Sequence, residues 1–425
     1  MIRDERLKSD AWPEMRIAFV VDRYWPAAGG VQTLIRHVGR ALAAQHEVVV
    51  VADRIDDGPA DRLGESLRRP PAFAAFADGG VSVVPLELSL RHRARLFPLV
   101  AEVVPGLGRH AYGPPRVLMA SLYARVIGPL IAEKAGKPDV VHVWDTTALL
   151  GAAAMRAGRL VGSPVVATPC IHPGQWGDDF ASRWVLRRAD CVISLLDADR
   201  DVVRACGVSL DRTAICGVCS PQVPIGGGPK VRAHHGIDGP LVLFLGVRRH
   251  YKGHDLLLSV ADTVASSVPG AVFAFVGPGP ELDTAAVKTR IIDVGRVDDV
   301  ARGGWLDAAD VLCLPSQHEI FPLSVLEAWS AKTPVVVSDL PPLIELIQAS
   351  RGGWTVARTA SALAATLITV LNDPDERRRA GIAGHAFWRS GHTPRVAAAC
   401  HERVYKSAID AVGATQRRHE ALCQP

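Results

Sequence analysis

The sequence has no long uncharged apolar run, little net charge, and no second cysteine pair near its C-x-x-C. No apolar run is both long enough and free enough of charge to span a bilayer, and Met1–Asp10 lacks the apolar core of a signal peptide. Zinc would need two more ligands beside Cys216 and Cys219, so we expect these two residues to be ordinary thiols. Scattered cysteines without a signal peptide predict a cytoplasmic protein, because thiols stay reduced there.

The charge balance argues against a nucleic-acid binder. Lysine and arginine number 48 against 44 aspartates and glutamates, and no basic stripe interleaved with aromatic residues is present. Hydrophobic residues make up 48% and charged residues 22% of the chain, which is a globular balance. A chain of 425 residues is too long for one ordinary core, so the length predicts two domains.

A first set of alternating strands and helices begins near the N-terminus. The sequence predicts a buried strand at 16–21, a helix at 31–45 and a second strand at 47–52. This order forms a βαβ unit, which predicts a parallel sheet covered by helices. Gly29 and Gly30 let the backbone approach a ligand at the helix start, although a plain tight turn is the alternative interpretation.

A second set follows a stretch rich in proline and glycine, 221–240, which we interpret as a linker. The apolar runs 241–246 and 272–276 predict buried strands, and a glycine-rich turn begins at Gly277. Two such sets predict an α/β protein with two doubly wound, Rossmann-like domains. In such domains, ligands bind beyond the carboxyl ends of the strands.

Three polar residues accompany strands that we expect near 138–145 and 165–168. The rule for doubly wound sheets would bring His142, Asp145 and His172 near one crevice. Most single histidines are structural or merely exposed. His172 is the better candidate, because its loop is punctuated by proline and glycine at a strand exit.

The segment 310–329 is the centre of the candidate site. A short buried strand is predicted at 310–315, and Pro322 suits the first position of a helix, where its missing N–H would have been unpaired. A helix start offers free N–H groups and a positive dipole end to an anion such as a diphosphate. Glu319 and Glu327 could each accept hydrogen bonds from sugar hydroxyls, whereas taken alone each could equally be a solvated glutamate.

Two cations follow the strand predicted at 241–246. Arg249 and Lys252 lie in the loop 247–253, and cations at a strand exit can clamp a diphosphate. In isolation such a loop would be unremarkable. Together with the two glutamates, it predicts a site for a nucleotide diphosphate-sugar.

The stretch 309–336, with Glu319 and Glu327 eight positions apart, resembles the E-x7-E signature of retaining GT-B glycosyltransferases of the fourth family. In that family the first glutamate contacts the donor sugar and the second contacts the nucleotide ribose. The resemblance therefore assigns the sugar to Glu319 and the ribose to Glu327. It covers roughly 16–410 and is strongest in 241–345.

The chain departs from the family pattern just after Glu319. Ile320 and Pro322 stand where the family usually has glycines, and a proline cannot donate a backbone hydrogen bond. The backbone N–H groups of Leu323, Ser324 and Val325 can still donate, and we expect Leu323 and Ser324 to bind the donor.

The resemblance implies further donor contacts in the second half of the chain. Arg249 and Lys252 occupy the phosphate-binding places of a G-x-x-R-x-Y-K-G pattern. Gly277 opens a turn that approaches the donor closely. Val297 lies in the turn where the nucleotide base stacks and bonds to backbone.

In the first half, Gly29 and Gly30 match a G-G-V that faces the donor phosphates and the acceptor in this family. The family often has a histidine two residues after the residue that Thr168 matches, where this chain has Cys170. His172 comes two residues later, and we expect it to take the catalytic place of that histidine.

The implied fold is GT-B, with two domains facing across a cleft. The acceptor-side domain would be 1–225, the nucleotide-sugar domain 226–390, and a helix in 391–425 would cross back onto the first domain. The implied activity is retaining, metal-independent transfer of a hexose from a GDP-mannose or UDP-glucose type of donor. The acceptor would be a glycan, a lipid-linked or a small molecule, and no cofactor other than the donor substrate and no metal is expected. A nucleotide-sugar epimerase of the same fold and an inactive GT-B partner protein are the alternatives.

A basic cluster, Arg91–Arg95, stands beside an apolar run, Leu96–Val100. Such a segment could contact anionic lipid at the inner face of the membrane or an acidic acceptor. A solvated basic face is the more common explanation. Peripheral membrane contact is thus one expectation beside a cytoplasmic location, and no nucleic-acid partner is expected.

Overall fold

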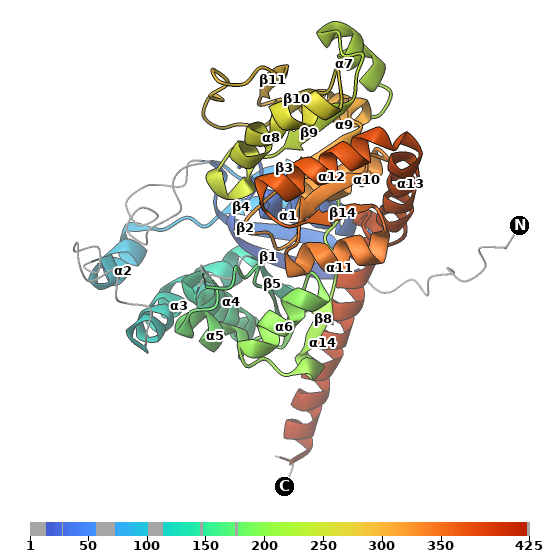
Figure 1. Ribbon diagram of the computed structural model, residues 1–425. Coiled ribbons are helices and arrows are strands. Elements are labelled where there is room, and N and C mark those ends of the chain that lie inside the picture. The colour runs from blue at the N-terminus through green and yellow to red at the C-terminus, as the bar shows by residue number, and fades with distance from the viewer. Residues whose placement is uncertain are drawn as a thin grey trace, which may run out of the picture. The chain divides into compact units, whose positions relative to one another are not determined.

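Two β-sheets flanked by helices organise the chain (Figure 1). A computed structural model describes residues 14–27, 29–56, 73–100, 114–144, 148–174 and 177–422. Contacts divide the chain into two units. The first comprises Met1–Pro169, Asp179–Val192 and His401–Pro425, and the second comprises Cys170–Asp178 and Ile193–Cys400. The α/β class that the sequence predicts is confirmed.

The first sheet has eight strands. They are β1 (Arg16–Arg23), β2 (Glu47–Arg54), β3 (Phe76–Asp78), β4 (Val81–Pro85), β5 (Val140–Trp144), β6 (Val165–Thr168), β7 (Cys191–Ser194) and β8 (Thr213–Ile215). Their order is β3-β4-β2-β1-β5-β6-β7-β8, and β3 pairs antiparallel with β4. The other pairs for which a register is defined are parallel. The strand order reverses at β1, which lies between β2 and β5.

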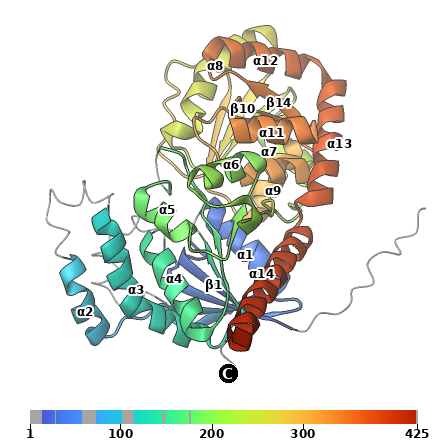
Figure 2. The same ribbon diagram turned by 90° about the horizontal axis from the view of Figure 1, so that it is seen from below.

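Six helices follow the strands of the first unit or end in it. They are α1 (Gly30–Leu42), α2 (Leu90–Val100), α3 (Pro114–Ala135), α4 (Ala148–Val161), α5 (Phe180–Leu186) and α14 (Pro394–Leu422), and Figure 2 shows them from a second side. Helix α1 buries Leu34, Ile35, Val38 and Leu42, which recur at helical spacing along one face. Residues of α14 up to Cys400 belong to the second unit, and those from His401 to the first.

The second sheet has six strands. They are β9 (Leu241–Leu245), β10 (Val272–Val276), β11 (Ile291–Gly295), β12 (Val311–Leu314), β13 (Val335–Ser338) and β14 (Gly353–Val356). Their order is β11-β10-β9-β12-β13-β14, and all defined pairs are parallel. Counted from β9, this is the 3-2-1-4-5-6 order of a doubly wound dinucleotide-binding sheet. The order reverses between β9 and β12.

The helices of the second unit lie between and after the strands β7 to β14 in the chain. They are α6 (Asp197–Ala205), α7 (Gly228–His235), α8 (His254–Ser267), α9 (Asp299–Ala308), α10 (Leu323–Ser330), α11 (Pro341–Ser350), α12 (Ala360–Asn372) and α13 (Pro374–Gly391). Short 3-10 turns lie at Leu210–Arg212 and His250–Lys252. Every residue of β9, β10, β12 and β13 is buried. Continuous apolar runs are expected of parallel strands that are covered on both faces.

Two local predictions from the sequence are wrong. The stretch 221–240, interpreted as a linker, contains helix α7, which has a proline in its first turn and ends at Gly236 in a left-handed conformation. Cys216 is not a thiol, because it forms a disulfide with Cys400. The two cysteines are 184 positions apart, so no local spacing indicates the pair. Cys219 is a free, buried cysteine, as expected.

His142 does not line a ligand site, contrary to the prediction. It lies in the middle of β5 and is fully buried. Its Nδ1 is 2.7 Å from the Tyr405 hydroxyl and its Nε2 is 2.9 Å from the Thr168 hydroxyl. Burial, followed by the nearby His401, keeps the pKa of His142 well below its usual value. His142 is therefore a neutral core histidine, and Asp145 lies outside the described residues.

The predicted basic cluster lies on helix α2. Arg91 and Arg95 are exposed, but Leu96, the first residue of the apolar run, is buried. Side chains 97–100 lie outside the described set. None of the described helices combines the length and the apolar character that a membrane crossing needs. Contact with a membrane surface stays a prediction.

Replacing Tyr405 by phenylalanine should lower the free energy of unfolding by about 1–3 kcal/mol, because one ring nitrogen of the buried His142 loses its hydrogen-bond partner. Urea unfolding of Tyr405→Phe against wild type measures this loss. Tyr251→Phe is the matched control, since the Tyr251 hydroxyl makes no hydrogen bond within the described residues. Equal unfolding midpoints for the two variants would contradict the role given to Tyr405.

Candidate active site

The candidate site lies at the carboxyl ends of β9 and β12, where the order of the second sheet reverses. The two strands are adjacent, with Val242 opposite Val311 and Leu243 opposite Leu312. The loop after β9 carries Lys252, and the loop after β12 carries Glu319. Crevices at such reversal points are where doubly wound sheets bind ligands.

An ion pair joins these two loops. Lys252 Nζ lies 2.7 Å from Glu319 Oε1, and the Ser316 hydroxyl donates to the same oxygen at 2.8 Å. The exposed fractions of the side chains are 22% for Lys252 and 6% for Glu319. The glutamate is thus fixed by two donors, and charge-assisted hydrogen bonds of this kind are the stronger ones.

The backbone also brings the two loops together. Gln317 N donates to Tyr251 O at 2.7 Å. Gly253 has a φ of +76°, and a Cβ at this position would lie 2.1 Å from the backbone oxygen of Pro315. Only glycine combines that conformation with so close an approach. The Arg358 guanidinium, from the segment after β14, donates to the same Pro315 oxygen at 3.1 Å.

His172 lies beside the Lys252–Glu319 pair, and its catalytic role stays a prediction. It lines a cavity of about 250 Å³ together with Glu319 and His318. Burial is the largest cause that lowers the pKa of His172, to about 4, and the charges of Lys252 and His318 lower it further. The imidazole is therefore neutral near pH 7, so it can exchange hydrogen bonds but carries no charge.

Helix α10 starts beside this pair. Pro322 is its N-cap residue and Leu323 its first helical residue, one position later than predicted. Val325 N bonds to Pro322 O, which leaves the N–H groups of Leu323 and Ser324 at the open end of the helix. The sequence predicts a third available donor, the Val325 N–H, and this is wrong because that group is already bonded within the protein.

Glu327 lies one turn into α10 and is buried. Its Oε1 is 3.4 Å from the Arg302 guanidinium on α9. Burial raises the pKa of Glu327, whereas Arg302 lowers it and Asp299 raises it. A buried carboxylate needs such a partner. Sequence reasoning missed Arg302, because no short motif links it to Glu327.

The loop after β9 contains two kinds of arginine. Arg249, predicted to bind phosphate, is exposed. Arg248 is buried and forms an ion pair with Asp293, so its charge is already matched within the protein. Gly277 directly follows β10, and Val297 lies in the turn after β11. Both therefore stand at carboxyl ends of strands in the second sheet.

Gly29 and Gly30 belong to the first unit. Gly29 is the N-cap residue of α1, and Gly30 is its first helical residue. They lie beyond the carboxyl end of β1, the strand at which the first sheet reverses its order. Their place in the first sheet is therefore equivalent to that of the loop after β9 in the second.

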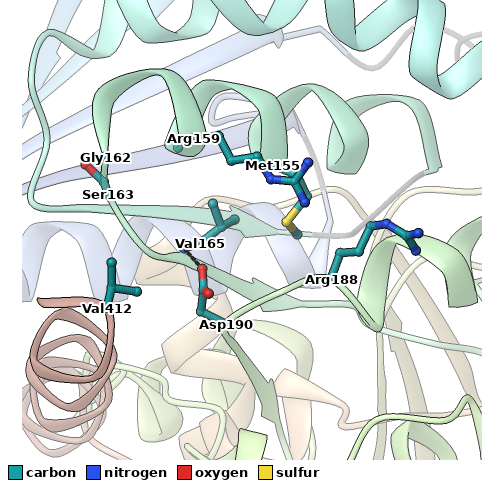
Figure 3. A pocket seen from close by; sticks show the side chains of 9 residues that line it. Met155, Arg159, Gly162, Ser163, Val165, Arg188, Asp190 and Val412 are labelled. Atoms are coloured by element: carbon teal, nitrogen blue, oxygen red, sulfur yellow. Dashed lines mark hydrogen bonds between the residues drawn. The ribbon is translucent and has the colours of Figure 1, made fainter. Parts of the chain in front are cut away.

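A second cavity, of about 310 Å³, lies in the first unit (Figure 3). Its lining includes Arg159 and Arg188, and the Asp190 carboxylate accepts the Val165 N–H there at 2.7 Å. Val165 is the first residue of β6, and Asp190 directly precedes β7. The cavity is thus at the amino ends of these strands, opposite to the edge where doubly wound sheets bind ligands.

Among the described residues, no three histidine, cysteine, aspartate or glutamate side chains lie close enough together to hold a metal ion. Asp199, which sequence reasoning missed, lines the same cavity as His172. Its Oδ2 accepts the Leu195 N–H at 2.8 Å, and burial raises its pKa to about 6. An acidic residue three positions into a helix that bonds back to the chain before it is a common cap.

Gly253→Ala should destabilise the protein by more than the roughly 1–2 kcal/mol that a left-handed alanine costs, because its Cβ would clash with the Pro315 backbone. Gly270→Ala is the matched control. Gly270 has a φ of +81°, but the nearest atom to its Cβ lies 3.8 Å away. Thermal unfolding of both variants isolates the clash, and equal losses would show that the two loops can separate freely.

The chain matches two family models. One, described as "Glycosyl transferase 4-like domain", matches residues 29–218. The other, "Glycosyl transferases group 1", matches residues 239–373 and includes the Lys252–Glu319 pair. The second match spans all six strands of the second sheet, and the first spans the strands of the first sheet from β2 to β8.

Curated relatives match nearly the whole chain. Glycogen synthase of Mycobacterium tuberculosis (strain CDC 1551 / Oshkosh) is 27% identical, over 93% of this chain and 95% of its own length. D-inositol 3-phosphate glycosyltransferase 1 of Catenulispora acidiphila is 28% identical, over 87% and 98%. Sucrose-phosphate synthase from Thermosynechococcus elongatus has a similar structure, with a TM-score of 0.69 at 18% identity, over 94% and 100%. The fold is GT-B, and each half of the chain is similar to a family described as glycosyl transferases.

Proposed function

We propose that the protein is a retaining glycosyltransferase that moves a hexose from a nucleotide diphosphate-sugar to an acceptor. The Lys252–Glu319 pair beside the start of α10 is the observation that carries this proposal. It joins a cation, a carboxylate and free backbone N–H groups at the ligand-binding edge of a doubly wound sheet. Diphosphate and sugar hydroxyls are the groups that such a set binds together.

The diphosphate would be bound by Arg249, Lys252 and the N–H groups of Leu323 and Ser324. As the bond from the anomeric carbon to the phosphate oxygen breaks, its electron pair stays on the diphosphate, whose charge increases. Fixed cations and helix N–H groups stabilise charge that develops in a transition state. The acceptor oxygen attacks the face of the sugar that the diphosphate leaves, so the anomeric configuration is retained. A phosphate oxygen takes the proton of the acceptor hydroxyl.

The remaining residues would hold the rest of the donor. Glu319 accepts hydrogen bonds from the transferring sugar, and neutral His172 bonds to the sugar beside it. Glu327 accepts from the ribose, while Gly277 and Val297 approach the donor phosphates and base through their backbone.

We propose no resident cofactor, because the donor itself supplies the activated sugar. Arg249, Lys252 and the dipole of α10 would supply the positive charge that a divalent metal supplies elsewhere, so turnover should survive chelation of metals. In the first unit, Gly29 and Gly30 would approach the donor phosphates and the acceptor. The acceptor is a glycan, a lipid-linked molecule or a small molecule.

A thermal-shift screen of nucleotide sugars, including UDP-glucose and GDP-mannose, tests this function, because a ligand bound only by the folded state raises the melting temperature. Proton NMR of the donor that binds best then follows its anomeric signal with and without acceptors, in the presence of EDTA. Transfer or slow hydrolysis with retention supports the proposal. An epimerised free donor would assign an epimerase, and binding without any consumption would assign an inactive partner protein.

Lys252→Ala should lower kcat by about 10²–10³-fold, the loss expected when one preorganised charge stabiliser is removed. It should also lower stability by about 1–3 kcal/mol, since the nearly buried Glu319 keeps only its bond from Ser316. Turnover is therefore measured well below the melting temperature. Lys230→Ala, on exposed α7, removes the same charge elsewhere and should leave kcat unchanged.

The two glutamates should fail differently when each is changed to glutamine. Glu319→Gln should lower kcat strongly, because a misplaced anomeric carbon slows the reaction directly. Binding of the bare nucleoside diphosphate should stay nearly intact, because that ligand lacks the sugar that Glu319 holds. Glu327→Gln should weaken binding of both donor and nucleoside diphosphate by roughly 1.5–3 kcal/mol, the value of a hydrogen bond to a charged group. Calorimetry with the nucleoside diphosphate measures the difference. If Glu327→Gln binds the nucleoside diphosphate as tightly as the wild type, Glu327 does not bind the ribose.

A further inference from the structure

The cavity beside Glu319 and His172 extends beyond these two residues. Four segments of the second unit form it. They are residues 171–173, the first turns of α6, residues 317–320 and the start of α11 at 340–342. Eight of its thirteen lining residues are apolar. A hexose carries hydroxyls on most of its carbons, and hydroxyls placed against apolar walls would lose their hydrogen bonds to water without replacement. The cavity is thus a poor match for a second sugar ring.

The start of helix α11 offers the cavity no hydrogen-bond donor. Its first two helical residues are Pro341 and Pro342, which have no N–H. The next two N–H groups, of Leu343 and Ile344, both donate to Leu340 O at 2.9 and 2.8 Å. A helix start normally presents free N–H groups to polar ligands, and here they are absent or already bonded.

The start of helix α6 is closed in a different way. The N–H groups of Asp197 and Ala198 donate to the Glu345 carboxylate at 2.9 and 2.8 Å. The Leu195 N–H donates to Asp199. Between these capped positions and the next turn, Ala198 and Val202 present apolar side chains to the cavity. Two helices therefore start at this cavity. Prolines remove the first two N–H groups of α11, and at α6 the N–H groups of Leu195, Asp197 and Ala198 are already bonded.

Three polar lining residues, His172, His318 and Glu319, lie on the side of the reacting centre. Asp199 lines the cavity from α6, where its Oδ2 already accepts the Leu195 N–H. His172 feels the charges of both Lys252 and His318, and Lys252 bonds Glu319. A molecule seated in the cavity would therefore have its apolar part against α6 and α11 and its polar end beside Glu319. A volume of about 250 Å³ has room for an aromatic ring with a substituent, because an apolar cavity of about 150 Å³ already holds benzene.

We propose that this cavity binds an apolar group of the acceptor, an aryl ring or a short alkyl chain, directly beside the hydroxyl that receives the sugar. The inference rests on the proposed function and narrows its acceptor to a molecule that carries both a hydroxyl and an apolar group. The transferring sugar stays at the edge formed by Glu319 and His172, and only the apolar group of the acceptor lies against α6 and α11.

Methyl, phenyl and octyl glucosides are the probes for this inference. The phenyl and octyl glucosides should raise the melting temperature of the wild type at concentrations at least about tenfold below that of methyl glucoside, the scale on which apolar pockets discriminate. Val202→Phe fills the cavity and should abolish that preference. Arg204→Phe adds the same ring at an exposed position of the same helix and should keep it. Ala198→Leu fills the cavity from a neighbouring position, should Val202→Phe fail to fold.

Equal effects of methyl and phenyl glucoside on the wild type, or a phenyl preference that survives in a folded cavity-filling variant, would overturn the inference. Donor hydrolysis without acceptor should be unchanged in Val202→Phe, and its loss would mean that the donor sugar occupies the cavity. The failure of the proposed function is separate: it would appear as a wild type that binds no nucleotide sugar, whatever the glucosides do.

Discussion

The contact between the loop after β9 and the loop after β12 is the constraint on which the candidate site depends. Gly253 allows the first loop to lie against the Pro315 backbone, and in that arrangement Lys252 Nζ lies 2.7 Å from Glu319 Oε1. Arg358, two residues after β14, donates a hydrogen bond to the same Pro315 backbone oxygen. The site thus needs strands that are distant in sequence but share the carboxyl edge of one sheet, so the doubly wound strand order is a condition for its chemistry.

Three helices start near this edge, and they differ in whether the N–H groups of their first turns are free to bind a ligand. Helix α10 leaves the N–H groups of Leu323 and Ser324 for a ligand, whereas α6 is capped by Glu345 and α11 begins with two prolines. A free helix start attracts anions, and a capped or proline-blocked start does not. One surface can therefore bind a diphosphate at α10 and an apolar group between α6 and α11, without competition between the two.

Sequence reasoning identified most of the strands and the candidate cluster, because both produce local signals. Buried parallel strands such as β9 and β10 are continuous apolar runs, and Lys252 and Glu319 lie in the loops that follow two such runs. What it could not identify depends on pairs far apart in the chain. Cys216 with Cys400 and His142 with Tyr405 leave no local trace, and His142 was misplaced because a buried histidine and a ligand-binding one look alike in sequence.

The charges of the site are divided in a way that separates phosphate from sugar. The pKa of His172 is lowered to about 4, so near pH 7 the positive charge resides on Lys252 and the exposed Arg249. A neutral imidazole does not compete with these cations for the diphosphate, and it can both donate and accept hydrogen bonds. Hydroxyls need such a partner, whereas phosphates need charge. In the proposed complex we therefore expect the sugar, and not the phosphates, on the side of His172, next to the cavity.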